Sequence, residues 1–99
     1  MEGIIWYKTK QKGLMRLDKL ISDYAKIGVG ILSMHSHMSK TYVQFLNGDI
    51  WRTVSATRNS RGEISNIALI DLDIEQDIID TIIMPTLKKK PYQVYNFYN

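Results

Sequence analysis

The chain has no cysteine, which excludes disulfide bonds and thiolate metal sites. It also lacks a long hydrophobic run, because no apolar stretch approaches the roughly 20 residues that a helix needs to cross a membrane. The opening residues, MEGIIWYKTKQK, place an acid before a very short apolar run and the lysines after it, which is the wrong order and length for a secretory signal. We therefore expect a cytoplasmic protein that is not bound to a membrane.

The composition that remains is typical of one small globular domain. The 99 residues are 44% hydrophobic and 23% charged. This length suits a single domain over residues 1–99, but not a catalytic lobe joined to a separate binding lobe. The net charge of +3 is mildly basic, so nucleic acid or another polyanion is a permitted partner.

The charges are unevenly distributed along the chain. Half of the acids lie between Asp71 and Asp80, whereas the basic residues gather in three other segments. These basic segments contain Lys8, Lys10, Lys12 and Arg16, then Arg52, Arg58 and Arg61, and finally Lys88, Lys89 and Lys90.

The first half of the chain predicts a strand, a helix, a second strand and a hairpin. GIIWYK, from Gly3 to Lys8, combines β-branched and aromatic residues and predicts the first strand. After the loop TKQKG, apolar residues recur at helical spacing from Leu14 to Lys26. VGILSMH predicts the second strand. TYVQFLNGDIWRTVSA contains two alternating runs joined by Asn47-Gly48, a pair that tolerates the positive φ of a tight turn and so predicts a β-hairpin.

The second half predicts a buried strand, a helix and a tail. IALIDL is apolar on both faces, as expected of a strand in the middle of a parallel sheet. Asp73 and Gln76 have the spacing of an N-cap and its partner, and they would open a helix that ends near Pro85. The inward face of this helix would carry Ile74, Ile78, Ile82 and Ile83.

Strands that alternate with helices predict an α/β fold. We expect a small two-layer or three-layer sandwich with parallel central strands, a β-hairpin and two main helices. The tail, residues 88–99, is either an edge strand or a flexible end. Its Tyr92, Tyr95, Phe97 and Tyr98 could stack on single-stranded bases, pack on the sheet, or add a strand to a second copy through residues 91–99.

The segment YVQFLNGDIWRTVSATRNSRGEISNIALIDLDI resembles the middle of the ATPase domain of phage terminase large subunits and related P-loop motor ATPases. In that family, a hairpin with an asparagine-glycine turn leads to small residues, an arginine-glycine pair and an apolar Walker B strand that ends in acids. The matching positions here are Asn47, Gly48, Ser55, Ala56, Ser60, Arg61, Gly62 and the run Ile67 to Asp71. The resemblance implies a P-loop NTPase-like fold and a phage protein in a bacterial host.

This chain departs from the family at the residues that carry the chemistry. Gly13 stands at the last glycine of the phosphate loop, but Leu14 and Met15 occupy the lysine and hydroxyl positions. Leu72 replaces the glutamate that would polarise the attacking water. The resemblance therefore implies a degenerate relative that does not hydrolyse nucleotides, with Gly13 and Asp71 as vestiges of the nucleotide site.

Two pairs of residues have the spacing of metal ligands. His35 and His37 would share one face of a strand, but no third ligand lies nearby in sequence. Asp71 and Asp73 could hold magnesium, although a strand-end acid followed by a helix cap explains both. We expect no metal and no other cofactor.

These observations favour a non-enzymatic binding protein whose partner is nucleic acid or a host or phage protein. The candidate residues for nucleic acid or phosphate are Lys8, Lys10, Lys12, Arg16, Arg58 and Arg61. The first alternative is a nucleotide-binding switch or weak NTPase that uses a degenerate phosphate loop with Asp71. The second is a self-associating structural subunit that is joined through the tail.

Overall fold

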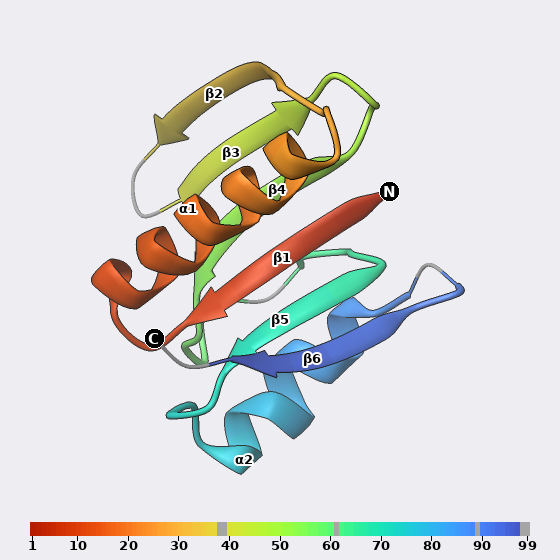
Figure 1. The fold of residues 1–99 in the computed structure, drawn as a ribbon. Coiled ribbons are helices and arrows are strands. Elements are labelled where there is room, and N and C mark those ends of the chain that lie inside the picture. Colours follow the sequence, from red (N-terminus) through yellow and green to blue (C-terminus); the bar gives the residue numbers. More distant parts are fainter. Residues whose placement is uncertain (38–39, 61, 89, 98–99) are drawn as a thin grey trace.

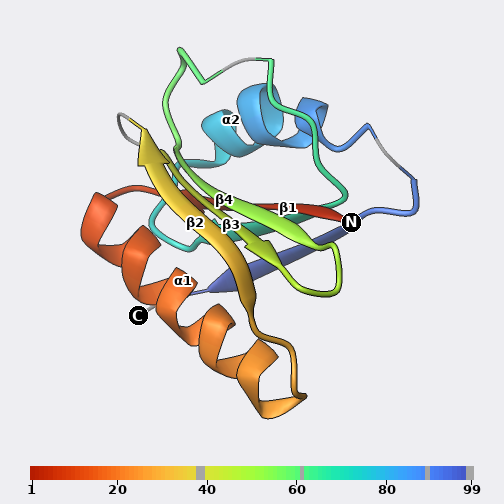
Figure 2. The ribbon, with the colours of Figure 1, turned by 90° about the horizontal axis from the view of Figure 1, so that it is seen from above.

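The computed structural model describes residues 1–37, 40–60, 62–88 and 90–97 as one sheet with helices on both faces (Figures 1 and 2). The strands are β1 (Glu2–Tyr7), β2 (Ile31–His37), β3 (Lys40–Phe45), β4 (Ile50–Ser55), β5 (Ile67–Asp71) and β6 (Gln93–Phe97). The helices are α1 (Lys10–Lys26) and the short α2 (Gln76–Ile78), which continues as the π-helical η1 (Ile79–Ile83) and the 3₁₀-helical η2 (Met84–Thr86). Within these ranges, no helix is both long and apolar enough to span a membrane.

The sheet has six strands in the order β2-β3-β4-β1-β5-β6. β1 pairs in parallel with β4 on one side and with β5 on the other, and β6 extends the parallel part beyond β5. The hairpin of β3 and β4 and the pairing of β2 with β3 are antiparallel. The predicted α/β class, the parallel central strands and the hairpin at Asn47-Gly48 are therefore confirmed, and Gly48 has the positive φ of +94° that its turn requires.

The two faces of the sheet carry two separate cores. On one face, Ile4 and Trp6 of β1 pack with the inward residues of the second helical segment. On the other face, Ile5 packs with Leu17 and Leu20 of α1. Successive side chains of a strand point to opposite faces, so the run IIW serves both cores and the sandwich has three layers.

Helix α1 begins at Lys10, which is four residues earlier than the predicted start at Leu14. Thr9 is the N-cap, and its hydroxyl accepts a hydrogen bond from the backbone N–H of Lys12 at 3.4 Å. The prediction placed a loop there because Lys10, Gln11 and Lys12 interrupt the apolar pattern, but polar residues on the exposed side of a first turn do not end a helix.

Gly13 brings α1 into close contact with β1. A Cβ atom at this position would lie 2.6 Å from Cδ2 of the Tyr7 ring, far inside van der Waals contact. Gly13 is buried in the helix and is not in the positive-φ region. Its role in this structure is therefore to let the helix pack closely on the end of β1.

We predict that Gly13→Ala lowers the free energy of unfolding by about 1–3 kcal/mol, because the clash with Tyr7 outweighs the better helix propensity of alanine. Urea unfolding measures this change. Gly30→Ala is the matched control, since the nearest atom to its Cβ, Leu46 Cδ1, is 3.4 Å away. Equal stability of the two variants would contradict the packing role of Gly13.

The predicted helix after β5 is present, but Asp73 is not its N-cap. The N-cap is Glu75, and the backbone N–H of Asp73 donates to Asp71 Oδ1 at 3.0 Å. The Asp73 side chain instead forms an ion pair with Lys12, which lies at the start of α1. It is therefore not available to cap the second helix, which is the role that the sequence pattern had predicted. The predicted inward residues Ile74, Ile78, Ile82 and Ile83 are all buried, and Pro85 lies in the last turn.

Tyr24 fastens the end of α1 to the hairpin. Its ring stacks on Phe45 with the ring centroids 3.8 Å apart. Its hydroxyl donates to Asp49 Oδ2 at 2.7 Å and accepts from the Trp51 indole N–H at 3.0 Å. Burial, together with the hydrogen bond to Asp49, raises the pKa of Tyr24 to about 12.

The raised pKa predicts a loss of stability in strong base. The unfolded tyrosine releases its proton near pH 10.0, so the contribution of Tyr24 is complete below that pH and is lost as the pH rises toward about 12. Tyr24→Phe should cost about 1 kcal/mol at neutral pH and should remove this part of the alkaline loss. Urea unfolding of the wild type and of Tyr24→Phe between neutral pH and about pH 12 tests this prediction. A difference in free energy of unfolding that stays constant over this pH range would contradict it.

The tail forms the edge strand β6, which was one of its two predicted states. β6 pairs with β5 along its length, from Ile67 with Gln93 to Asp71 with Phe97. The tail therefore completes the sheet of its own chain, while Lys89 and Tyr98 lie outside the described residues.

Candidate functional site

The carboxyl ends of the parallel strands meet at one edge of the sheet. After β1 the chain turns to α1 on one face, whereas after β4 the loop segments 56–60 and 62–66 lie on the face that carries α2 (Figure 2). Ligands of open α/β sheets commonly bind where neighbouring strands send their connections to opposite faces, because a crevice opens there. The gap between the ends of β1 and β4 is such a position.

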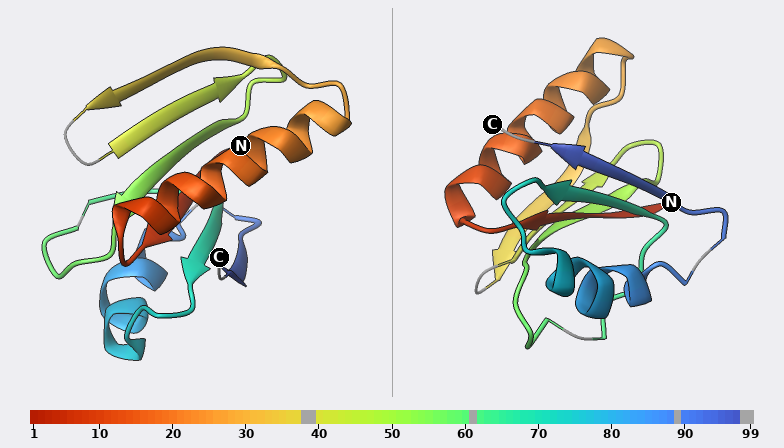
Figure 3. Two further views of the ribbon diagram at one scale, coloured as in Figure 1. Left: turned by 60° about the vertical axis from the view of Figure 1, so that its left-hand side comes forward. Right: turned by 90° about the horizontal axis from the view of Figure 1, so that it is seen from below.

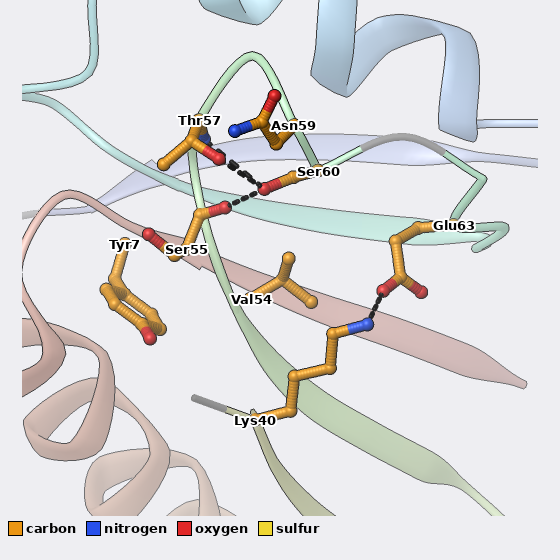
Figure 4. A pocket seen from close by; sticks show the side chains of 8 residues that line it. All are labelled: Tyr7, Lys40, Val54, Ser55, Thr57, Asn59, Ser60 and Glu63. Atoms are coloured by element: carbon orange, nitrogen blue, oxygen red, sulfur yellow. Dashed lines mark hydrogen bonds and ion pairs between the residues drawn. The ribbon is translucent and has the colours of Figure 1, made fainter. Parts of the chain in front are cut away.

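A pocket of about 420 Å³ lies at this position. Figure 4 shows Lys40, Glu63 and Val54 on one side and the 55–60 turn on the other, with the Tyr7 ring at the end of β1. The lining is polar, with hydroxyls from the turn and one amide. Its residues are Tyr7, Lys40, Val54, Ser55, Thr57, Asn59, Ser60 and Glu63.

The turn in this pocket is held by its own hydroxyls. The Ser60 hydroxyl donates to the Ser55 carbonyl and lies 3.0 Å from the Thr57 hydroxyl. Only Asn59 at the tip makes no hydrogen bond or ion pair among the described residues of the turn. The hydroxyls of Thr57 and Ser60 are thus engaged in holding the shape of the turn.

The opposite wall carries a network of ion pairs. Glu63 pairs with Lys40 and also accepts from the Arg52 guanidinium at 2.8 Å. Burial alone would raise the pKa of Glu63, but the hydrogen bonds and charges of Lys40 and Arg52 outweigh burial and hold it below its usual value. Glu63 therefore remains a carboxylate that positions β3 and the loop, not a proton donor.

Asp71 ends β5 beside this crevice and is completely buried. Its carboxylate accepts hydrogen bonds from the backbone N–H groups of Lys8, at 3.3 Å, and Asp73, at 3.0 Å. Lys12 Nζ lies 3.7 Å from the same carboxylate. Asp71 thus joins the end of β5 to the exit of β1 and to the first turn of α1.

The basic cluster that the sequence placed around a phosphate loop is partly paired with these acids. Lys12 Nζ bonds to the Asp73 carboxylate and Lys8 Nζ to its backbone carbonyl at 3.2 Å. The hydrogen bond between the Lys12 ammonium and the Asp73 carboxylate raises the pKa of Lys12 and lowers the pKa of Asp73. The carboxylates of the chain itself therefore occupy the position near the start of α1 where an external anion would bind.

The connection from β1 to α1 consists of Lys8 and Thr9 alone. A phosphate loop needs several successive backbone N–H groups turned toward one point, and this connection is too short to supply them. Leu14 and Met15 are largely exposed, at 37% and 49%, on the surface of the helix.

The remaining predicted residues lie apart from one another. Lys10 is exposed, and Arg58 pairs with Asp77 beyond the pocket. Arg16 lies over the Phe97 ring on the α1 face, 5.9 Å from the ring centroid. Arg61 lies outside the described residues.

The predicted histidine pair lies on the edge strand β2. His35 stacks on Tyr42 with 5.0 Å between the ring centroids. Across the part of the chain that the structure describes, no three His, Asp or Glu side chains are grouped as metal ligands.

Sequence reasoning missed the residues of the pocket itself, although Arg58, a candidate for phosphate binding, follows Thr57 directly in the chain. Lys40, Thr57, Asn59 and Glu63 carry no motif. The available signal was a polar loop directly after a strand next to the centre of a parallel sheet. Using that signal requires the strand order, which local patterns do not determine.

Neither a protein-family model, nor a curated protein, nor a solved structure matches this chain. The relation to terminase ATPases that the segment from Asn47 to Asp71 suggests therefore stays a prediction.

We predict that Asp71→Asn lowers the free energy of unfolding by about 1–3 kcal/mol, because the amide cannot accept both backbone N–H bonds and leaves Lys12 with less compensating charge. Thermal unfolding with and without millimolar magnesium separates this structural role from metal binding. Asp77→Asn, at a half-exposed side chain, is the control. A magnesium-dependent gain in the wild-type melting temperature that vanishes in Asp71→Asn would instead identify a metal site.

Proposed function

We propose that this chain is a non-enzymatic binding protein that recognises another protein strand along the open edge of β2. The partner that this edge fits best is a second copy of the chain, paired antiparallel about a two-fold axis. Two sheets would then join into one continuous sheet. A degenerate P-loop ancestry and a phage origin are compatible with this role and stay predictions.

The observation that carries the proposal is the exposure of β2. All seven residues of this strand are exposed, and the apolar Leu32 and Met34 are exposed by 58% and 56%. Its sequence, ILSMHSH, contains no lysine, arginine, acid or proline. Edge strands of monomeric proteins usually carry such residues to prevent pairing with other chains, so an edge that lacks them favours association.

The apolar surface continues beyond the strand. Ile27, at the end of α1, is 73% exposed, and Leu46, in the hairpin turn, is 65% exposed. The backbone N–H of Leu46 donates to the Gly30 carbonyl at 2.9 Å, which holds the turn beside the start of β2. Leu46 therefore adds an exposed apolar side chain beside the start of β2, and Ile27 is a further one in the chain that leads to this strand.

The other edge of the described sheet is less suited to pairing. β6 has five residues against the seven of β2, and Lys88, Lys90 and Pro91 precede it. Lysine and proline are common means of protecting an edge. This difference favours β2 over the tail as the self-association surface.

Nucleic acid is less well supported as the partner. Lys8 and Lys12 interact with Asp73, and Arg58 with Asp77, so binding DNA would require breaking interactions within the chain. Fluorescence titration with single-stranded and double-stranded DNA at low salt tests this alternative directly.

We predict that the wild-type chain self-associates reversibly and that Met34→Lys weakens this association at least about tenfold, because the symmetric pair places two new charges in one interface. Sedimentation velocity over a concentration series measures it. Met15→Lys is the matched control, since it makes the same change at a methionine of similar exposure on α1. A wild-type monomer at every concentration, or equal weakening by both substitutions, would overturn the proposal.

A further inference from the structure

A second pocket, separate from both the carboxyl edge and β2, lies between α1 and β6. It has a volume of about 420 Å³, which is the size of a small-molecule site. Its lining is mainly apolar, with Leu20, Trp51, Ile67 and Leu69, and it also includes Arg16, Tyr95 and Asn96. Figure 3 shows the carboxyl end of β6 close to the first half of α1, where Arg16 lies.

A glycine shapes the apolar lining of this pocket. Gly3 of β1 pairs with Trp51 on one side and with Ile67 on the other, so the three residues form a row across the sheet. A Cβ atom at Gly3 would lie 2.4 Å from Cε3 of Trp51, which means that the indole ring covers the space where a side chain would stand. The indole therefore lies across β1, and although Trp51 is only 3% exposed, it contributes to the lining of the pocket beside β5.

Arg16 supplies the one cationic group of the pocket. Its Nη1 atom is buried and has no hydrogen-bond partner among the described residues. The Phe97 ring lies under the guanidinium, 5.9 Å away at its centroid, and burial lowers the pKa of Arg16. The charge of Asp23, two helical turns further along α1, raises the pKa of Arg16, but by less than burial lowers it. The ion pairs among the described residues do not include one between Arg16 and Asp23.

A buried guanidinium nitrogen without a partner is costly, and a carboxylate is the acceptor that matches its planar geometry best. An aromatic ring attached to that carboxylate would lie against Tyr95, which is 51% exposed, and would shield the apolar lining next to Trp51 from water. Inorganic phosphate would satisfy the charge but leave the apolar lining exposed to water. The pocket thus complements a molecule that carries both groups.

We propose that the groove between α1 and β6 binds a small aromatic carboxylic acid, with Arg16 holding the carboxylate and the ring lying against Tyr95 over the apolar lining that includes Trp51. This site is independent of the pairing along β2, and one function can fail without the other. No covalent step is involved, so the role of the ligand would be to stabilise or regulate the protein.

The two tryptophans of the chain make a direct test possible. Trp51 lines the groove, whereas Trp6 is completely buried in the core on the other face of the sheet. Titration with 3-phenylpropionate, followed through the indole N–H signals in ¹H–¹⁵N NMR spectra, should move the Trp51 signal to saturation and leave the Trp6 signal in place. The neutral 3-phenylpropionamide should bind at least about tenfold more weakly, because it loses the charged hydrogen bond.

Arg16→Gln should weaken binding of the acid by the same factor, and Arg58→Gln, which removes an equal charge outside the groove, should bind like the wild type. Equal affinity for the acid and the amide, unchanged binding by Arg16→Gln, or a Trp51 signal that does not move would each overturn the proposal. If inorganic phosphate shifts the Trp51 indole N–H signal as strongly as the acid does, the claim that the groove selects an aromatic ring would be overturned. If Arg16→Gln does not fold, the comparison of acid with amide on the wild-type protein decides the question.

Discussion

The burial of β1 on both faces and both edges is the constraint on which the rest of the fold depends. Ile4, Ile5 and Trp6 are completely buried. Because successive residues point to opposite faces, both faces of this strand carry apolar side chains that must be kept from water. One helix must therefore cover each side, and parallel neighbours must satisfy the backbone along both edges. The three layers and the crossover of α1 follow from this requirement.

The burial of β1 also explains the charges at the carboxyl edge. The last N–H groups of a strand buried this deeply need acceptors, and the Asp71 carboxylate supplies one for Lys8. A buried carboxylate in turn needs a cation, which Lys12 provides from the first turn of α1. The basic residues that looked like a binding surface in sequence are in part the counterions of this arrangement. In the same way, the glycine that resembled part of a phosphate loop is a contact between a helix and an aromatic ring.

The elements and the class of the fold were predictable from local patterns, because burial imposes a period on each segment. The apolar alternation around Asn47-Gly48 gave the hairpin, and the spacing of Ile74, Ile78 and Ile82 gave the second helix. The role of Asp73 was not predictable, since it depends on contacts with Lys8 and Lys12, which are more than sixty positions away in sequence. The start of α1 at Lys10 was missed for a different reason, because its cap, Thr9, precedes polar residues that hide the helical period. The pocket was missed for the same reason as the role of Asp73. Lys40 and Glu63 meet only after the strand order is fixed.

The position of β1 in the middle of the sheet has a consequence for the synthesis of the chain. β1 precedes both of its neighbours in sequence, and β4 and β5 leave the ribosome only after residues 55 and 71 have been added. Until then, a strand whose Ile4, Ile5 and Trp6 are completely buried in the finished fold has no edge to pair with. α1 can form beside it at once, because its N-cap lies within the chain already made. α1 is thus the one partner of β1 that is available before β4 and β5, and it covers the face that carries Ile5.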